Sequence, residues 1–165
     1  MDSTFKIGGK FYIKCFDSDG TLKWEDEAKN LVTNEGLDHI LDAVLHGTTP
    51  VSPWYVGLTD GTPIPAAEDT LSGAHAGWTE VTAYTGDRQE YVEAAASSQS
   101  ITNSASKASF SIDTNSTTVG GAFLFSAATT TTGTLLCVAA FTGGDKSADS
   151  GDTLEVTYTI SAADA

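Results

Sequence analysis

The chain has 165 residues, of which 40% are hydrophobic, and its apolar runs fall short of the roughly 20 residues that a membrane-spanning helix needs. Its 22 acidic residues outnumber the 8 basic ones and give a formal net charge of −14, so its surface repels phosphate and is unsuited to nucleic acid. The start, MDSTFKIGGKFYIKCF, has no apolar segment of the signal-peptide kind, and we expect a soluble protein made in a cytoplasm.

The charges are unevenly distributed along the chain. Five of the 8 basic residues are lysines within the first 30 residues, where they face six acids. The remaining residues carry 16 acids against 3 basic residues, and the only arginine is Arg88. The near-neutral first segment is therefore the part best suited to contact another protein.

The first 30 residues predict a β-hairpin. Residues 11–16 alternate two faces, one with Phe11 and one with Tyr12, and Asp19-Gly20 supplies the turn before a return strand at 21–24. Because both faces carry aromatic rings, we expect both to be covered, one of them by another chain. We divide the chain into an amino-terminal hairpin or arm, residues 1–30, and a main domain, residues 31–165.

Residues 34–46 predict one amphipathic helix. Apolar residues recur at helical spacing, at Leu37, Ile40, Leu41, Val44 and Leu45. Thr33 or Asn34 can cap its start, and Gly47 follows the last apolar residue, where a left-handed stop is common. A helix of this length is unstable alone, so we expect it to lie on a sheet.

The rest of the chain predicts short strands separated by turns. The clearest strands are 53–58, 107–112, 121–126, 134–141 and 153–161, with weaker ones at 80–84 and 90–94 and a long surface loop at 61–78. Seven to nine such strands are typical of an all-β fold. We predict an antiparallel, jelly-roll-like β-sandwich with one helix and an amino-terminal hairpin.

Catalytic and metal-binding patterns are weak. His39 and His46 lack a zinc-type motif and are interpreted as solvated helix residues, while His75 could join a loop metal site only with Asp69 or Glu80. We expect no catalytic residue, no cofactor and no metal.

Acidic turns and the two cysteines receive similar interpretations. Asp17-Ser18-Asp19-Gly20 resembles the start of a calcium loop, but its continuation lacks the required ligands, so a hairpin turn is preferred. Turn chemistry is also preferred to weak cation binding for three neighbouring acids, Asp145, Asp149 and Asp152. Cys15 and Cys137 lie in separate apolar runs, and we expect buried thiols, with a disulfide left open.

The aromatic residues of the middle segment allow two interpretations. Core and inter-subunit packing is the commoner role for aromatic rings in small sandwiches. The alternative is a carbohydrate-binding platform, for which the candidates are Trp54, Tyr55 and Trp78.

An ordered series of motifs resembles a known family. The motifs are KNLVTNEGLDHILDAVL, WYVGLTD, AGWTEVTAY followed by R-x-x-Y, and GGDKSADSGDTLEVTYTI. Over residues 29–161 they resemble small structural proteins of tailed bacteriophages, either head decoration (cement) proteins or fibre-like proteins. The resemblance implies a β-sandwich virion protein that is assembled in many copies and has no catalytic residues.

From the residues and the resemblance we expect a non-enzymatic capsid decoration protein on the capsid exterior, which stabilises the shell against the pressure of packaged DNA. Its expected partners are the major capsid protein and sister subunits in a dimer or trimer. The expected contact residues are Phe5, Lys6, Lys10, Phe11, Tyr12, Lys14, Phe16 and Trp24. The alternative is a tail or head fibre module that binds a host surface glycan.

Overall fold

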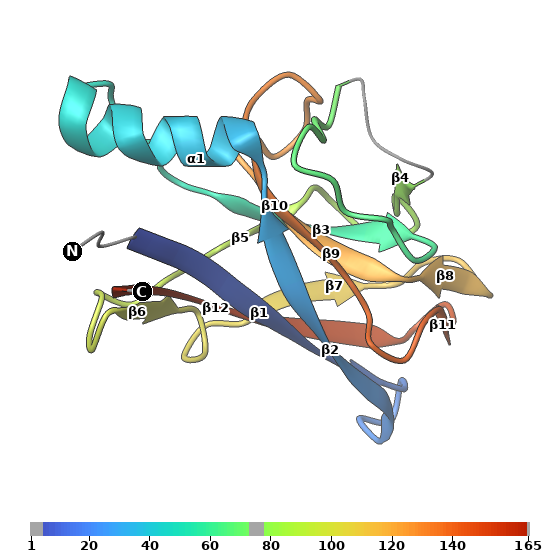
Figure 1. Cartoon of the computed structure of the whole chain (residues 1–165). Helices are drawn as coiled ribbons and strands as arrows, with labels where there is room; N and C mark the ends of the chain where they lie inside the picture. The colour runs from blue at the N-terminus through green and yellow to red at the C-terminus, as the bar shows by residue number, and fades with distance from the viewer. Residues whose placement is uncertain (1–4, 73–77, 165) are drawn as a thin grey trace.

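The computed structural model describes residues 5–72 and 78–164 (Figure 1). One helix begins as α1 (Asn34–Leu41) and ends as a π-helical segment, η1 (Asp42–His46). The strands are β1 (Phe5–Phe16), β2 (Leu22–Val32), β3 (Tyr55–Asp60), β4 (Thr79–Glu80), β5 (Gln89–Glu90), β6 (Ser100–Thr102), β7 (Ala108–Ser111), β8 (Thr117–Val119), β9 (Gly121–Phe125), β10 (Leu135–Ala140), β11 (Lys146–Ala148) and β12 (Thr153–Asp164). The predicted all-β fold with one helix and an amino-terminal hairpin is confirmed.

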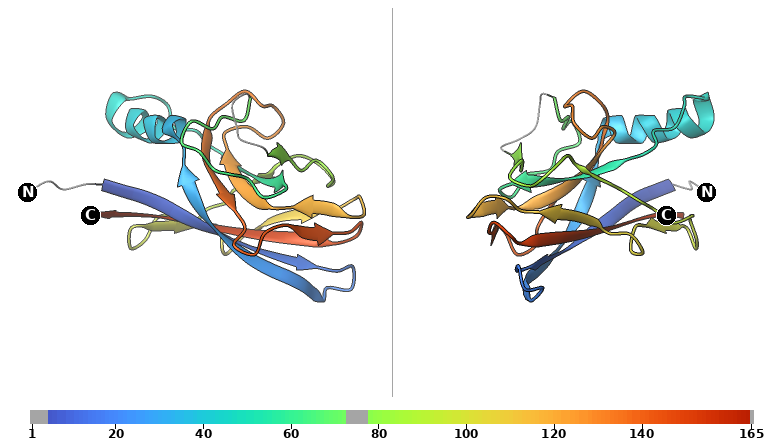
Figure 2. Two further views of the ribbon diagram at one scale, coloured as in Figure 1. Left: turned by 45° about the vertical axis from the view of Figure 1, so that its right-hand side comes forward. Right: turned by 180° about the vertical axis from the view of Figure 1, so that it is seen from behind.

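Ten of the strands form a single antiparallel sheet that curls into a half-barrel (Figure 2). Its order is β4-β3-β9-β10-β2-β1-β12-β6, with β5 beside β3 and β7 beside β12, while β8 and β11 pair separately. The two layers expected of a sandwich are thus two halves of one sheet. β2 joins them, because its residues up to Lys29 pair with β1 and its last three, Asn30–Val32, pair with β10.

The main core lies on the concave side of the curled sheet. β1 contributes every second residue, as its alternation predicts, and Phe11 stacks on Tyr158 of β12 with ring centroids 4.1 Å apart. Burying each such large apolar side chain stabilises the fold by roughly 1.5–3 kcal/mol. The hairpin is therefore a central part of the sheet: β1 pairs with β12 along all 12 of its residues. The division of the chain at residue 30 stays a prediction.

β9 and β10 are buried on both faces because a second apolar cluster lies on their convex side. This cluster consists of Leu71, Trp78, Phe123, Phe125, Leu135 and Val138. The segment predicted as a long loop supplies its cover, and residues 61–72 contain neither helix nor strand. The predicted strands 80–84 and 90–94 are reduced to the two-residue strands β4 and β5.

The helix is anchored to the sheet at its start. Thr33 caps it by accepting a hydrogen bond from the Gly36 N–H and donating one to the Leu135 carbonyl. Gly36 is buried against Leu136 of β10, which brings the two backbones together. At the other end Gly47 adopts φ 78°, the left-handed stop that the sequence predicts. The predicted bounds 34–46 are confirmed, and the helix runs outward beyond the sheet (Figure 1).

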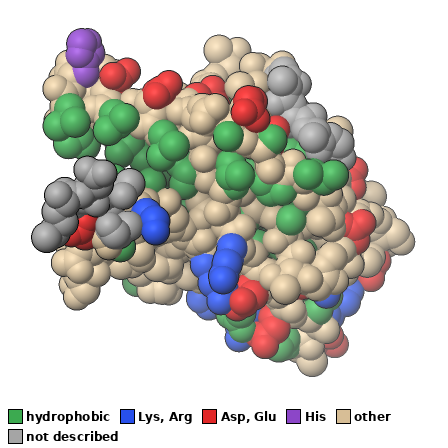
Figure 3. Space-filling model, viewed as in Figure 1, with side chains coloured by type: hydrophobic (Ala, Val, Ile, Leu, Met, Phe, Trp, Pro, Cys, Tyr) green, Lys and Arg blue, Asp and Glu red, His purple; other side chains and the backbone are tan. Residues whose placement is uncertain are grey.

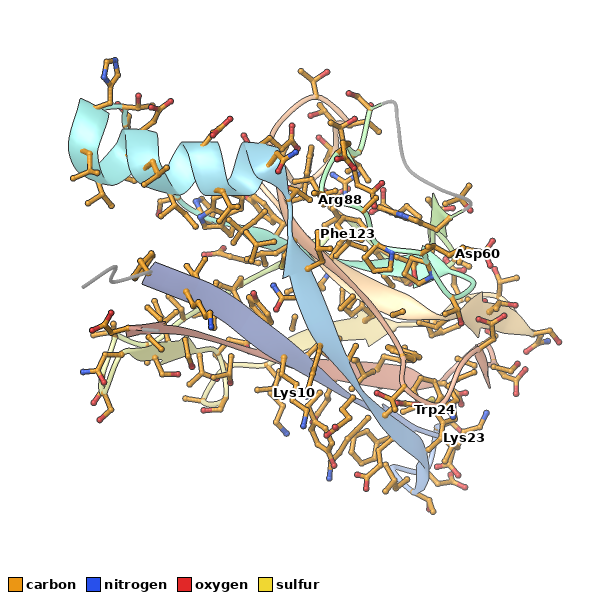
Figure 4. The ribbon with its side chains drawn as sticks, in the orientation of Figure 1. Lys10, Lys23, Trp24, Asp60, Arg88 and Phe123 are labelled. Atoms are coloured by element: carbon orange, nitrogen blue, oxygen red, sulfur yellow. The ribbon has the colours of Figure 1, made fainter. Side chains whose placement is uncertain are left out.

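Arg88, the only arginine, connects β4 to the loop that follows β9. Its buried guanidinium holds the Glu80 carboxylate through two hydrogen bonds of 2.6 Å and also donates to the carbonyls of Ala127 and Thr130. It lies 5.1 Å from the centroid of the Phe125 ring and 5.8 Å from that of Phe123, which is labelled with Arg88 in Figure 4. Planar, bidentate pairing of this kind is specific to arginine.

Replacing Gly36 with Ala tests the close approach of helix and sheet. A Cβ there would lie 2.9 Å from the Leu136 Cα and closer to its carbonyl oxygen. The gain of about 1 kcal/mol in helix propensity is outweighed by overpacking, so we expect Gly36→Ala to lower the free energy of unfolding by about 1–2 kcal/mol in urea titrations. Gly8→Ala is the matched control, because no atom lies within 4 Å of its Cβ. Equal stability of both variants would contradict the packing argument.

Arg88→Lys tests the buried clamp. Lysine keeps the charge but cannot hold both Glu80 oxygens, so we expect a loss of roughly 2–4 kcal/mol of unfolding free energy. Lys107→Ala, which breaks an exposed ion pair with Glu155, should cost less than about 1 kcal/mol in the same urea titration. A loss at Arg88 no larger than that at Lys107 would show that the clamp is dispensable.

Candidate interaction surfaces

The predicted contact residues of the hairpin divide between two faces of the sheet. Lys6, Lys10, Tyr12, Lys14 and Phe16 share the convex face of β1, because residues alternate along a strand. Phe5, Phe11 and Trp24 face the concave side, where Phe11 is fully buried. Trp24 packs on Phe141 and donates a hydrogen bond to the Ser147 carbonyl. The eight residues therefore do not form one surface.

The convex face of β1 and β2 carries a row of ion pairs. Lys10 pairs with Glu27, and Lys14 lies 3.3 Å from Glu25. The Tyr12 hydroxyl also donates to Glu25, and this hydrogen bond, followed by that from Lys14, lowers the pKa of the Glu25 carboxyl. Exposed pairs of this kind contribute little stability. They leave a face of mixed charge on an otherwise acidic protein.

The three aromatic candidates for a carbohydrate platform do not lie together. Trp78 is buried in the second cluster, 5.5 Å from the Phe123 ring centroid. Tyr55 is half-buried on β3, while Trp54 packs against the main core and meets His39 edge-on. Packing, the commoner of the two roles, accounts for Trp78.

An apolar hollow opens between the helix and the ends of β1 and β12; we call it the apolar mouth. It has a volume of about 290 Å³, and its lining includes Ile7, Ile40, Val44, Val51, Trp54 and Ile160. A second hollow of about 380 Å³ continues past Phe5 and Ala162 at the same strand ends. Figure 3 shows hydrophobic side chains gathered along the underside of the helix above this region.

A polar groove lies near the end of β3. It has a volume of about 290 Å³ and is lined by polar side chains that include Asp60, Glu80, Thr82, Asn115, Ser116 and Thr118. They come from the end of β3, from β4 and the residue two positions after it, and from β8 and the turn before it; Figure 4 labels Asp60 at the end of β3. From the sequence, residues 114–116 were only part of the connection between the predicted strands 107–112 and 121–126. Its one signal was the run of hydroxyl and amide side chains, which turns also contain.

Charged and nucleophilic groups elsewhere have structural partners. Lys23 binds Asp149 and Asp152 at 3.1 and 2.6 Å, whereas Asp145 accepts a hydrogen bond from Thr62, so the three acids do not converge. Asp17 accepts hydrogen bonds from the N–H groups of residues 19 and 21, and the turn interpretation is confirmed. Among the described residues, no group of three acids, histidines or cysteines is placed to hold a metal.

The histidines and cysteines form no reactive group in the described parts of the chain. His39 accepts a hydrogen bond from the Val51 N–H, and His46 is exposed at the helix end, while His75 lies outside the described residues. Both cysteines are free and buried, which confirms the expected thiols. Burial, reinforced by the nearby Asp152, raises the pKa of the Cys15 thiol to about 12, and burial raises that of Cys137 to about 11. Both thiols stay protonated at neutral pH.

No helix of residues 5–72 and 78–164 is both long and apolar enough to cross a membrane.

A search of curated proteins and a search of solved structures returned no match. The family model described as "Podophage GP4 fiber I protein gp80" matches residues 31–161, close to the region of the resemblance. The family is one of virion fibre proteins, which agrees with the expected non-enzymatic phage structural protein but not specifically with a cement protein. The chain therefore belongs to the gp80 fibre family of bacteriophage virion proteins.

Proposed function

We propose that this protein is a fibre module that binds a neutral carbohydrate of the host surface in the polar groove. The observation that carries the fibre role is the family match over residues 31–161. The groove supplies the chemistry, because hydroxyl, amide and carboxylate groups hydrogen-bond to sugar hydroxyls. Such contacts are weak singly and become strong when several copies bind together.

The charges of the groove favour a neutral ligand. Asp60 is exposed at the end of β3 and has no ion pair with any residue of the described chain. The net charge of −14 repels sugars that carry phosphate or carboxylate. The amide of Asn115 and the hydroxyl of Thr82 add a donor and a group that both donates and accepts.

The same groove is unsuited to cutting a glycan. Glycosidases of the common kind need two carboxyl groups on either side of the bond. Of the two that line this groove, Glu80 is held by both arms of Arg88, and Asp60 is left without a partner acid. A binding role without turnover follows from this arrangement.

Capsid decoration is the second candidate. It is supported by the convex face of β1 and β2, where lysines and acids alternate on an otherwise acidic protein. In that role this face would dock on the major capsid protein from the capsid exterior. The fibre role is preferred because the matching family is one of fibre proteins.

Substituting Asp60 and Asn115 with Ala tests carbohydrate binding. We expect labelled wild-type protein to bind sensitive host cells, and polysaccharide released from those cells to compete. The double variant should lose at least about ten-fold in affinity, because each lost hydrogen bond to the sugar weakens binding. Asp19→Ala removes the same charge at an exposed turn and should bind as the wild type. Unchanged binding by the double variant would disprove this use of the groove.

The location of the protein on the particle separates the two candidates. Gold-labelled antibodies to this chain, viewed by electron microscopy of intact virions, should mark an appendage. Labelling spread over the whole shell would instead support capsid decoration and rule out the fibre module.

A further inference from the structure

We propose that the apolar mouth is a self-association site, filled in the assembled protein by a second copy of this chain. The inference goes beyond carbohydrate binding and concerns a different region of the molecule. It stands on the exposure of the helix, the incomplete sheet beneath it and the arrangement of charges around both.

The helix extends past the sheet with its apolar side uncovered. The exposed fraction of the side chains rises along it, from 39% at Leu37 to 53% at Leu41, 75% at Val44 and 78% at Leu45. Gly36 at the start is buried, so the helix leaves the sheet progressively. An amphipathic helix gains its stability by burying this stripe, and contiguous exposed apolar side chains mark an interaction site.

The sheet beneath the helix is also incomplete. β1 pairs with β2 only from Lys10 onward, so Phe5–Gly8 has a strand on one side, β12, and an open backbone edge on the other. Phe5, on the concave face, is 64% exposed. An unpaired strand edge beside apolar side chains favours contact with another protein. The mouth thus has apolar side chains from the helix on one side and from the ends of β1 and β12 on the other, with an open hollow between them.

The charges around the mouth point to a second copy as the occupant. Asp38 and Asp42 are exposed on the helix, and Lys6 and Lys29 are exposed on the convex face of the strands below the helix. None of the four has an ion pair among the residues that the structure describes. Unpaired groups of opposite sign therefore lie on either side of the exposed apolar side chains of the helix (Figure 3), and the acids of one copy can pair with the lysines of another.

Self-association also has to overcome the acidity of the protein. Two copies with a net charge of −14 repel one another, so contact is favourable only through a surface that is apolar and locally balanced. The mouth is such a surface. Figure 3 shows its hydrophobic side chains between acidic groups above and basic groups below.

Sedimentation velocity of the full chain tests the proposal. Across about 1 to 100 µM we expect a dimer or a larger closed assembly, and Val44→Asp and Leu45→Asp should each raise the dissociation constant at least about 100-fold, because a charge is then placed in an apolar contact. Val44 lines the mouth, and Leu45 follows it on the exposed apolar stripe of the helix. Ile64→Asp is the matched control: Ile64 is 72% exposed but lies neither on the helix nor in the lining of the mouth, and this variant should assemble as the wild type. Circular dichroism verifies that each variant is folded.

Exchanging two charges tests whether the occupant of the mouth is a second copy of this chain. Asp42→Lys and Lys29→Asp should each weaken assembly, and the double variant should restore it if the two residues meet across the contact. A wild-type chain that stays monomeric throughout the series would overturn the proposal, as would unchanged assembly of both helix variants, or dissociation of Ile64→Asp to the same extent. The variant with Ala at positions 60 and 115 should keep its assembly, so a failure of carbohydrate binding is distinguishable from a failure of this proposal.

Discussion

The crossing of β2 from one half of the sheet to the other is the constraint on which this structure depends. After Lys29 the strand leaves β1 and pairs with β10. Asn30 supports the split, because its side chain accepts a hydrogen bond from the Gly9 N–H and donates one to the Tyr158 hydroxyl. Without this transfer the sheet would stay open and could not enclose a core. The crossing also leaves one edge of β1 unpaired over Phe5–Gly8 and directs the chain into the helix.

The candidate surfaces follow from this geometry. The split edge and the outward helix create the apolar mouth at the ends of β1 and β12, and the turn at the end of β3 forms part of the polar groove. The two surfaces use different residues and different chemistry. Carbohydrate binding and self-association can therefore coexist, and several copies joined through the mouth would present several grooves to one host cell, which is the arrangement that weak binding requires.

Electrostatics sets the conditions for both proposals. A strongly acidic protein resists non-specific contact with other copies of itself. Surfaces on which charge is balanced or absent are therefore the ones best suited to bind a partner. The buried Arg88–Glu80 pair illustrates the opposite use of charge. Its effect is to fix β4 against the loop after β9.

The sequence alone determined the features that depend on local spacing. Alternation predicted the inward row of β1 and the strand at 153–161, helical spacing and Gly47 predicted the helix at 34–46, and the acidic turn at 17–20 was interpreted correctly. Only the tertiary structure decided which strands pair, that the sheet is one curled layer, that Trp78 lies in a second cluster, and that the helix stripe is half uncovered. Local periodicity records which side of an element is apolar. What covers that side depends on contacts between residues far apart in the chain, and those contacts arise only when the strands have found their partners.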